Sequence, residues 1–160
     1  MAGARAVSAV RRAGARGDDA CPCGSGSAFA RCCEPVLDGV PATTAEALMR
    51  SRFTAYVLGD EDHLFRSWHP RTRPPGPYCH PGTRWTRLEI HEVVEAGAPT
   101  GAGLPGPGEA IVDFTAHCTT SDMRGRPVGD ALHERSLFRR RGGRWVYVEA
   151  VGDDSRGRRG

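Results

Sequence analysis

Four of the six cysteines in this chain fall within the thirteen positions from residue 21 to residue 33. They are Cys21, Cys23, Cys32 and Cys33. The first two flank a proline, a glycine-rich stretch follows, and the last two are adjacent. Gly24 and Gly26 allow the backbone to reverse tightly, so the four sulfurs can meet at one point. Because structural Zn²⁺ takes four tetrahedral ligands and favours thiolates, the spacing predicts a structural zinc ion bound by these cysteines.

Three other uses of clustered thiols compete with zinc. Disulfide pairing is typical of secreted chains, and we recognise no secretory signal ahead of the cluster. Redox centres usually contain a Cys-x-x-Cys pair, and iron–sulfur runs space their cysteines by about two to four residues. The Cys-x-Cys and Cys-Cys spacings favour zinc. We expect the amides of residues 24–27 and the Arg31 guanidinium to stabilise the negatively charged sulfurs.

The same stretch resembles a known motif. Cys-Pro-Cys-Gly-Ser-Gly with a distal Cys-Cys is similar to the SEC-C zinc motif, first known from the carboxy-terminal tail of the SecA translocation ATPase. In SecA-type motifs, lysines after the Gly-Ser-Gly form a basic face that is associated with docking to a chaperone or the ribosome. Here Ser27, Ala28 and Ala30 stand in that region. The resemblance implies a structural zinc knuckle that recognises a protein partner.

Composition and charge exclude several classes of function. The chain has 160 residues, with 22 arginines, no lysine and 19 acidic residues, and its formal net charge is +3. Such a balance predicts no strong nucleic-acid footprint. No apolar run approaches the roughly 20 residues that a membrane span requires. We therefore expect a soluble protein in the cytoplasm, where thiols stay reduced.

The chain is predicted to have four parts. Residues 1–19 are rich in alanine, glycine and arginine. They resemble an organelle transit peptide in composition, but they are also typical of a disordered bacterial leader, which we favour. The zinc knuckle covers residues 20–35 and a larger domain covers residues 43–151. Residues 152–160 are predicted to be a disordered tail.

Two helices are predicted after the knuckle. Residues 34–42 contain two prolines and are predicted to be a linker. Thr43 and Glu46 are spaced as the N-cap and N3 residues of a capping box, and apolar residues then recur at helical spacing. Asp60 predicts the cap of a second, shorter helix, which His69-Pro70 ends. The apolar side of this second helix is predicted to carry Leu64, Phe65 and Trp68.

The hydrophobic period changes from helical spacing to alternation after Arg84. Four strands are predicted, over residues 85–96, 110–119, 131–140 and 144–151. Turn-like connections join them, so consecutive strands form an antiparallel meander. Two amphipathic helices need an apolar surface, and the inner face of the meander supplies one. The predicted fold class is therefore α+β, with helices packed against a curved sheet.

Several separated runs in this region resemble the YchJ family, which is also called UPF0225. They are residues 44–56, 68–70, 133–138 and 143–148. Together with the SEC-C motif, they extend the resemblance over residues 21–151. Members are regarded as NTF2-like, with a cone of bent antiparallel sheet wrapped around helices and often enclosing a pocket. The resemblance implies this fold, the metal and homodimers formed through the outer sheet face, but no assigned biochemical role.

Seven side chains are candidates to line such a pocket. Phe114 on the second predicted strand and three alternate residues of the third are expected to point inward, because the aromatic rings need burial. The three are Glu134, Ser136 and Phe138. The predicted helices contribute Arg52, Tyr56 and Trp68.

Glu134 has two interpretations. As a structural residue it pairs with a helix arginine, because a buried charge must be paired, and Arg52 is a better partner than Arg50. As a catalytic residue, a desolvated Glu134 beside His69 would be a general base, as in ketosteroid isomerase or dehydratase relatives of the fold. We favour the structural pairing. We expect His69 to be an imidazolium that caps a helix C-terminus.

Two functions are consistent with these features. The first is a cytosolic zinc-containing adaptor, whose knuckle binds a protein partner and whose NTF2-like domain is a scaffold or ligand pocket. The alternative is a small-molecule enzyme of the isomerase, dehydratase or hydrolase type that uses Glu134 with His69. Four other histidines lack metal-like spacing and are expected at the surface or in loops, and they are His63, His80, His91 and His117.

Overall fold

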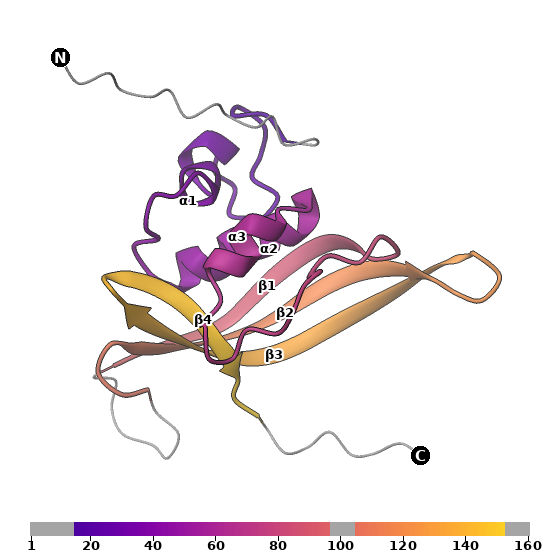
Figure 1. Cartoon of the computed structure of the whole chain (residues 1–160). Coiled ribbons are helices and arrows are strands. Elements are labelled where there is room, and N and C mark those ends of the chain that lie inside the picture. The colour runs from indigo at the N-terminus through magenta and orange to yellow at the C-terminus, as the bar shows by residue number, and fades with distance from the viewer. Residues whose placement is uncertain (1–14, 97–104, 153–160) are drawn as a thin grey trace.

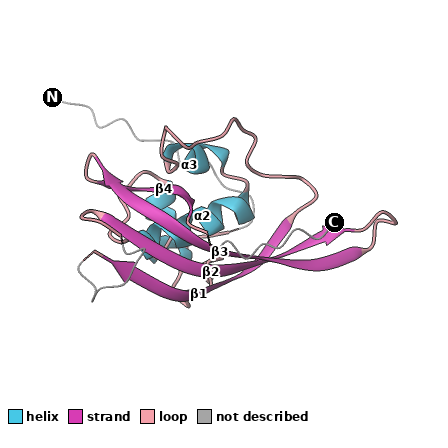
Figure 2. Cartoon of the chain, turned by 90° about the horizontal axis from the view of Figure 1, so that it is seen from below, coloured by secondary structure: helices cyan, strands magenta, loops and turns pink. Residues whose placement is uncertain are grey.

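The computed structural model describes residues 15–96 and 105–152. One antiparallel sheet has the order β1-β2-β3-β4, and its strands are Arg84–Glu95, Glu109–Ser121, Pro127–Arg141 and Arg144–Ala150. The α-helices α1 (Glu34–Leu37), α2 (Ala45–Leu58) and α3 (Glu61–Arg66) precede it. They lie over one face of the curved sheet (Figure 1). Figure 2 shows the chain from below, with the sheet in front of the helices. The predicted α+β class is confirmed.

The first described residues are hydrogen-bonded to the knuckle. The Phe29 N–H donates to the Asp19 carbonyl at 2.8 Å, and the Ala30 N–H donates to the Gly17 carbonyl at 2.9 Å. Hydrogen-bonded structure therefore includes the last residues of the segment that we assigned to the leader. The rest of that segment, and residues 153–160 of the predicted tail, lie outside the described residues.

Helix α2 begins later than the capping box predicts. Its N-cap is Thr44, whose Oγ1 accepts a hydrogen bond from the Ala47 N–H at 3.0 Å. The assignment of Thr43 as the N-cap is therefore wrong. Glu46 occupies the second helical position instead of the third, and its carboxylate pairs with Arg50 at 3.0 Å.

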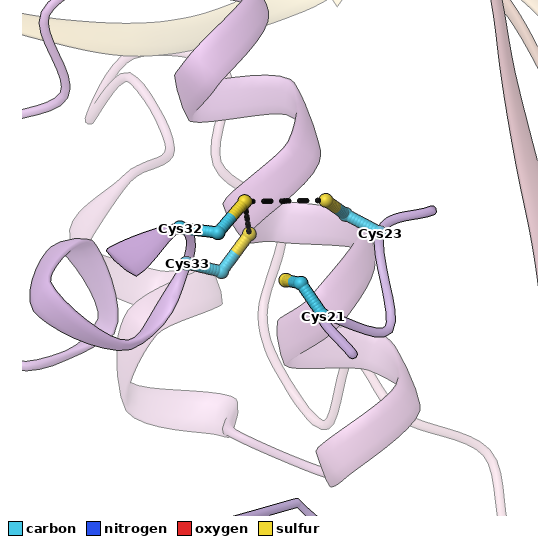
Figure 3. A group of neighbouring side chains, drawn as sticks. All are labelled: Cys21, Cys23, Cys32 and Cys33. Carbon is cyan, nitrogen blue, oxygen red and sulfur yellow. Dashed lines mark hydrogen bonds between the residues drawn. The ribbon is translucent and has the colours of Figure 1, made fainter. Parts of the chain in front are cut away.

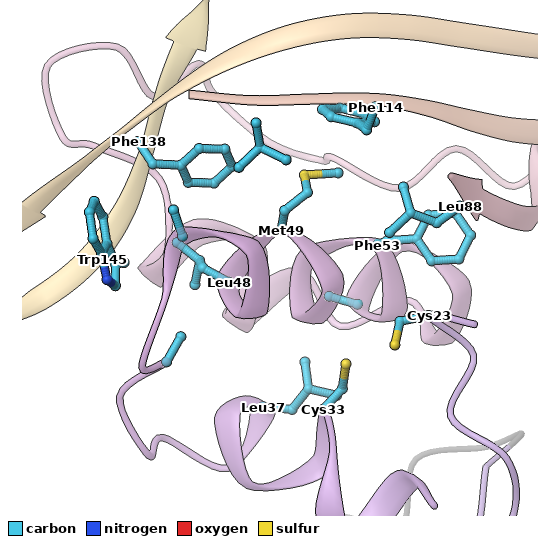
Figure 4. Close-up of a cluster of buried hydrophobic side chains, with 14 of the residues drawn as sticks. Cys23, Cys33, Leu37, Leu48, Met49, Phe53, Leu88, Phe114, Phe138 and Trp145 are labelled. Atoms are coloured by element: carbon cyan, nitrogen blue, oxygen red, sulfur yellow. The ribbon is translucent and has the colours of Figure 1, made fainter. Parts of the chain in front are cut away.

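Helix α2 lies between the sheet and the knuckle (Figure 4). On its sheet side, the cluster of buried side chains includes Met49, Phe53, Leu88, Phe114 and Phe138. On its knuckle side, the cluster includes Cys23, Cys33 and Leu37. A third side contacts α3, where the Ser51 Oγ lies 2.9 Å from His63 Nε2. His63 is buried within α3, so its expected position at the surface or in a loop is wrong. Because α2 is covered on three sides, residues 51–55 are all buried.

The strands of the central hairpin are longer than predicted. Ser121 pairs with Pro127, whereas the prediction ended the second strand at residue 119 and began the third at residue 131. Buried side chains alternate along the inner face of β2 from Ala110 to Cys118, as the hydrophobic period predicts. Register shifts occur twice along β1 and once between β3 and β4. Because such bulges bend a strand and increase its twist, they contribute to the curvature of the sheet.

Two short segments also differ from the prediction. The predicted linker contains α1, and α3 ends at Arg66, before Trp68. Phe65 is 48% exposed and not on the buried side of α3, and the Arg73 guanidinium lies 3.6 Å from its ring centroid. Within the described parts of the chain, no helix is long and apolar enough to cross a membrane.

The position of the N-cap can be tested with a matched pair of substitutions. Thr44→Ala should lower the free energy of unfolding by about 1 kcal/mol, because the Ala47 N–H loses its acceptor. Thr43→Ala should change it by less than about 0.5 kcal/mol, as a surface substitution does. Chemical denaturation of the metal-loaded protein measures both values. A larger loss for Thr43→Ala than for Thr44→Ala would contradict the observed cap.

Candidate metal centre and ligand cavity

The four clustered cysteines converge on one point (Figure 3). Their sulfurs all lie within 4.8 Å of one another. The Cys32 sulfur is 3.5 Å from that of Cys23 and 3.9 Å from that of Cys33. A tetrahedral zinc with Zn–S bonds of about 2.3 Å would separate its sulfurs by about 3.8 Å, whereas a disulfide needs about 2.05 Å. The cysteines are free, and the donor set fits a metal ion.

Local backbone structure positions these thiols. Gly24 and Gly26 have φ values of 76° and 85°, in a region that side chains with a Cβ rarely adopt. The Cys21 N–H donates to the Ser27 carbonyl at 2.9 Å, which closes the turn that carries the first two cysteines. A short 3₁₀ turn, Phe29–Arg31, then places the Cys-Cys pair beside the first two.

The polar contacts of the sulfurs agree with the prediction in part, because the backbone N–H of Ser25 is hydrogen-bonded to the Cys23 sulfur. The Ser25 Oγ lies 3.1 Å from the Cys32 sulfur, and the Thr54 Oγ1 of α2 lies 3.9 Å from the Cys21 sulfur. Arg31 is exposed, and no hydrogen bond joins it to a sulfur among the described residues. The nearer guanidinium is that of Arg50, which donates to the Cys23 carbonyl at 3.1 Å.

Burial affects the ionisation of this cluster. Burial and the neighbouring Cys23 sulfur raise the pKa of Cys32 to about 11, although a hydrogen bond from Ser25 opposes the shift. The thiol of Cys32 is therefore protonated at neutral pH unless a cation binds. A metal ion that enters the cluster displaces such protons.

A second candidate site is a cavity of about 230 Å³ between α2 and the inner face of the sheet. Five of the seven predicted pocket residues line it, and they are Arg52, Tyr56, Trp68, Phe114 and Glu134. Ser136 and Phe138 are fully buried and do not line it. The other lining residues are Met49, Phe53, Tyr78, Trp85, Ala116, Leu132 and Tyr147.

Sequence reasoning missed four aromatic residues of this cavity, and they are Phe53, Tyr78, Trp85 and Tyr147. Tyr147 packs edge-on against Trp68 with ring centroids 5.0 Å apart, and Tyr78 lies 5.4 Å from the same indole. The ring centroids of Trp85 and Tyr56 lie 5.8 Å apart. β4 gives a signal for Tyr147, because this residue lies two positions from Trp145 and therefore shares a face of the strand with that buried side chain. Tyr78 lies in the proline-rich segment of residues 71–82, between α3 and β1, where no hydrophobic period exists.

Arg52 is a buried cation in the wall of the cavity. Its side chain is 3% exposed, and its Nη1 donates to the Ser67 Oγ at 2.7 Å and to the Leu64 carbonyl at 3.2 Å. Its Cζ lies 4.8 Å from the ring centroid of Trp68 and 4.6 Å from that of Tyr147, which are cation–π distances. Burial lowers the pKa of Arg52, and the charges of nearby groups oppose the shift.

Glu134 does not form the predicted ion pair. Its Oε1 accepts hydrogen bonds from the Ser136 hydroxyl at 2.6 Å and from the Tyr147 hydroxyl at 2.8 Å. Among the described residues, no salt bridge joins this carboxylate to Arg52 or Arg50. The structural role of Glu134 is instead to link β3 to β4 through Tyr147. Burial and the Glu134 carboxylate raise the pKa of Tyr147, so its hydroxyl stays a donor.

His69 is not among the residues that line the cavity. Its backbone N–H donates to the Tyr147 carbonyl at 2.7 Å, and its Nδ1 accepts from the Arg71 N–H at 3.2 Å. Burial and the nearby arginines lower the pKa of His69, which favours a neutral ring. The expected imidazolium cap is therefore wrong, and the geometry does not place His69 with Glu134 as an acid–base pair.

The outer face of the sheet holds one more cluster, which joins His91, Asp113 and His133 from three strands. His133 Nε2 lies 2.7 Å from Asp113 Oδ1, and the Arg135 guanidinium lies 3.5 Å from Oδ2 of the same carboxylate. Two histidines and a carboxylate can bind a divalent metal. Here the charge of Asp113 is already compensated by Arg135. We interpret the cluster as a polar link across the strands.

Comparisons with known proteins match both parts of the chain. A family model described as "YchJ, middle NTF2-like domain" matches residues 44–150. A SEC-C motif model matches residues 19–35. The fold and the cysteine cluster thus define a SEC-C motif protein with an NTF2-like domain.

Curated relatives identify the family. A UPF0225 protein of Streptomyces coelicolor is 42% identical over 130 residues, which are 81% of this chain and 92% of the relative. A UPF0225 protein of Deinococcus radiodurans is 41% identical over 132 residues, which are 82% of this chain and 88% of the relative. The chain belongs to the YchJ family, UPF0225, as its sequence motifs indicate.

Solved structures agree with the fold. The solution structure of a SEC-C motif containing protein from Rhodopseudomonas palustris has a TM-score of 0.69 and 29% identity, and it covers 85% of this chain and 100% of that one. The crystal structure of a SEC-C motif containing protein from Psychrobacter arcticus has a TM-score of 0.59 and 20% identity, over 87% of this chain and 86% of that one. At that identity, the second likeness concerns the fold alone.

The loop that carries Tyr78 into the cavity wall depends on one carboxylate. The Glu61 side chain accepts hydrogen bonds from the N–H groups of Tyr78 at 2.9 Å and Cys79 at 2.7 Å. Although burial opposes them, these hydrogen bonds hold the pKa of Glu61 below its ordinary value of 4.5. A depressed pKa means that the ionised carboxylate stabilises the folded state.

Glu61→Gln should therefore lower the free energy of unfolding by about 1 kcal/mol at pH 7, because hydrogen bonds to a charged acceptor are lost. The extra free energy of unfolding that wild type has over Glu61→Gln should disappear as the pH falls below 4.5 and through the folded pKa of Glu61. Denaturation curves between about pH 3 and pH 7 measure the difference. Glu149→Gln, at an exposed position, is the control for the loss of a negative charge. If wild type and Glu61→Gln still differ in free energy of unfolding at the lowest pH measured, the proposed role of the Glu61 carboxylate is wrong.

Proposed function

We propose that this chain is a zinc-stabilised protein that binds a small molecule in the cavity between α2 and the sheet. The observation that carries the proposal is the cavity itself, with aromatic walls and a buried guanidinium. Ligand sites in proteins are typically apolar hollows with a few placed polar groups. This cavity has that character and lies in the domain that the family model matches.

Zinc is the metal that best suits the knuckle. Four thiolates with sulfurs at these separations suit a tetrahedral ion, and the SEC-C match supports the same assignment. The candidate ligands are Cys21, Cys23, Cys32 and Cys33. A shell of four protein ligands leaves no open position for water or substrate, so the role of the zinc is structural. The reduced thiolates that it needs are typical of the cytoplasm, which is the compartment that we propose.

The composition of the cavity supports binding over catalysis. Its lining contains no histidine or cysteine among the described residues, and Glu134 is its single carboxylate. The Oε1 of Glu134 already accepts two hydrogen bonds from hydroxyl groups. General acid–base catalysis needs a group that is free to move a proton to or from the substrate. The enzyme alternative, which pairs Glu134 with His69, therefore lacks its second group in the cavity.

A protein partner at the knuckle stays a prediction. The turn from Gly24 to Ser27 is exposed and is the surface that such a partner would contact. A homodimer through the outer sheet face also stays a prediction. Neither is needed for a ligand to bind between α2 and the sheet.

Metal content tests the first part of the proposal. Protein purified without added metal should contain about one zinc per chain by elemental mass spectrometry, because one four-thiolate site binds one ion. Cys33→Ser should lower the zinc content at least about tenfold, since a ligand is lost. Cys118→Ser, which changes a buried cysteine outside the cluster, should leave it unchanged. No metal, or a disulfide between clustered cysteines, would contradict the zinc assignment.

Blocking the cavity tests the second part. In an NMR screen of a general fragment library against the zinc-loaded chain, some fragments should bind with a Kd of about 1 mM or tighter and shift signals of cavity residues. Ala116→Leu should raise the Kd of these fragments at least about tenfold, because the larger side chain occupies the cavity that Ala116 lines. Ala131→Leu makes the same change at an exposed position and should leave Kd unchanged. If no fragment shifts cavity signals, the binding function is wrong.

A further inference from the structure

The cavity contains hydrogen-bond donors that the protein itself does not satisfy. A guanidinium offers five N–H donors, and the described hydrogen bonds of Arg52 all come from Nη1. The side chain is 3% exposed and lines the cavity, so bulk water does not readily solvate its remaining nitrogens. The one carboxylate in the lining, Glu134, attracts the guanidinium but forms no salt bridge with it among the described residues. A buried charge without a direct ion pair is costly. Arg52 therefore favours a ligand that supplies an anionic acceptor.

The ring of Trp68 packs against Arg52 in the same wall. The Arg52 Cζ lies 4.8 Å from the ring centroid of Trp68, and both residues line the cavity. The indole Nε1 is itself fully buried, so it is not presented to a ligand in the cavity. Trp68 therefore offers a ligand the apolar surface of its ring and makes a cation–π contact with the guanidinium.

The Tyr56 hydroxyl adds another polar group to this wall. Tyr56 follows Arg52 by one turn of α2 and lines the cavity. Burial raises the pKa of Tyr56, although the Arg52 charge opposes the shift, so the phenol stays protonated at neutral pH. A protonated hydroxyl can donate a hydrogen bond to an oxygen that also contacts Arg52.

From these groups we infer that the cavity binds small aromatic carboxylic acids, with the carboxylate held by Arg52 and the Tyr56 hydroxyl. The inference rests on the proposed binding function and gives its ligand class. A guanidinium presents a planar fork that matches the geometry of a carboxylate. The remaining walls are apolar and aromatic, including Phe53, Trp85 and Phe114, and they suit a flat ring.

The size and charge of the cavity narrow this class. Its volume of about 230 Å³ is below the range of about 300–1,000 Å³ for drug-sized ligands, so one ring or a fused pair of rings fits best. Glu134 also lines the cavity, and a second negative charge on the ligand would be repelled there. A monoanion is therefore favoured over a phosphate dianion. A ring hydroxyl or amine would suit Glu134, which is an acceptor when ionised.

The test compares acids with their neutral and cationic counterparts. Isothermal titration of the zinc-loaded full chain should show that 4-hydroxybenzoate and indole-3-carboxylate bind at least about tenfold more tightly than 4-hydroxybenzamide and indole-3-carboxamide. Tyramine should bind more weakly than either acid. NMR shifts of cavity residues should locate the acids at this site.

Conservative variants then identify the donors. Tyr56→Phe keeps the aromatic ring but removes the hydroxyl, and it should weaken the binding of the acids several-fold while affecting the binding of the amides less. Tyr78→Phe is the matched control, because Tyr78 also lines the cavity but its hydroxyl donates to the Pro74 carbonyl at 2.9 Å. Arg52→Lys keeps the positive charge but removes the planar guanidinium, and it should weaken the binding of the acids further. A thermal melt of each variant verifies that it is folded.

Each contrary result has a distinct meaning. If the amides or tyramine bind in the cavity as tightly as the acids, or if Tyr56→Phe and Tyr78→Phe change the binding of the acids alike, the ligand class is wrong while the binding function holds. If only ligands without a carboxylate shift cavity signals, the class is again wrong. If neither these compounds nor the general fragment library shifts those signals, both the class and the binding function are wrong.

Discussion

The burial of α2 on three sides is the constraint on which the rest of the structure depends. An amphipathic surface helix can direct its polar residues to water, but α2 buries five consecutive residues from position 51 to position 55. Its polar side chains must therefore find partners inside the protein. Ser51 contacts α3, Thr54 contacts a knuckle sulfur, and Arg52 donates to the end of α3 and lies in the cavity wall. Each of these contacts attaches the helix to a different part of the chain.

This arrangement joins the metal centre to the cavity through one rigid element. Thr54 lies beside the Cys21 sulfur, and its sequence neighbour Phe53 lines the cavity. Because the turns of a helix move together, the position of the knuckle on one side of α2 affects the position of the wall on the other. The same core contains Cys33 from the knuckle and Phe138 from β3, which are far apart in the sequence. The knuckle is therefore packed as part of the domain and is not a separate appendage.

Sequence reasoning succeeded where the signal is local and periodic. The cysteine cluster depends on spacing within thirteen positions, and the inner face of β2 depends on alternation, so both could be predicted. Alternation gives the face of Ser136 but not its depth, and this residue is fully buried, with β2 paired on one side of it and β4 on the other. Tyr78 could not be found, since a loop without a period has its position set by a distant carboxylate. The ion pair of Glu134 was wrong because the phenol of Tyr147, which is remote in sequence, satisfies the carboxylate.

The compactness of the cysteine cluster in sequence has a consequence for the order of synthesis. All four thiols are present once residue 33 has been made, before any strand of the sheet exists. Closing such a short loop costs little chain entropy compared with the pairing of distant strands. A nascent chain could therefore capture its metal ion while still attached to the ribosome. The knuckle would then be a preformed surface on which α2 folds, before the sheet closes over the opposite side.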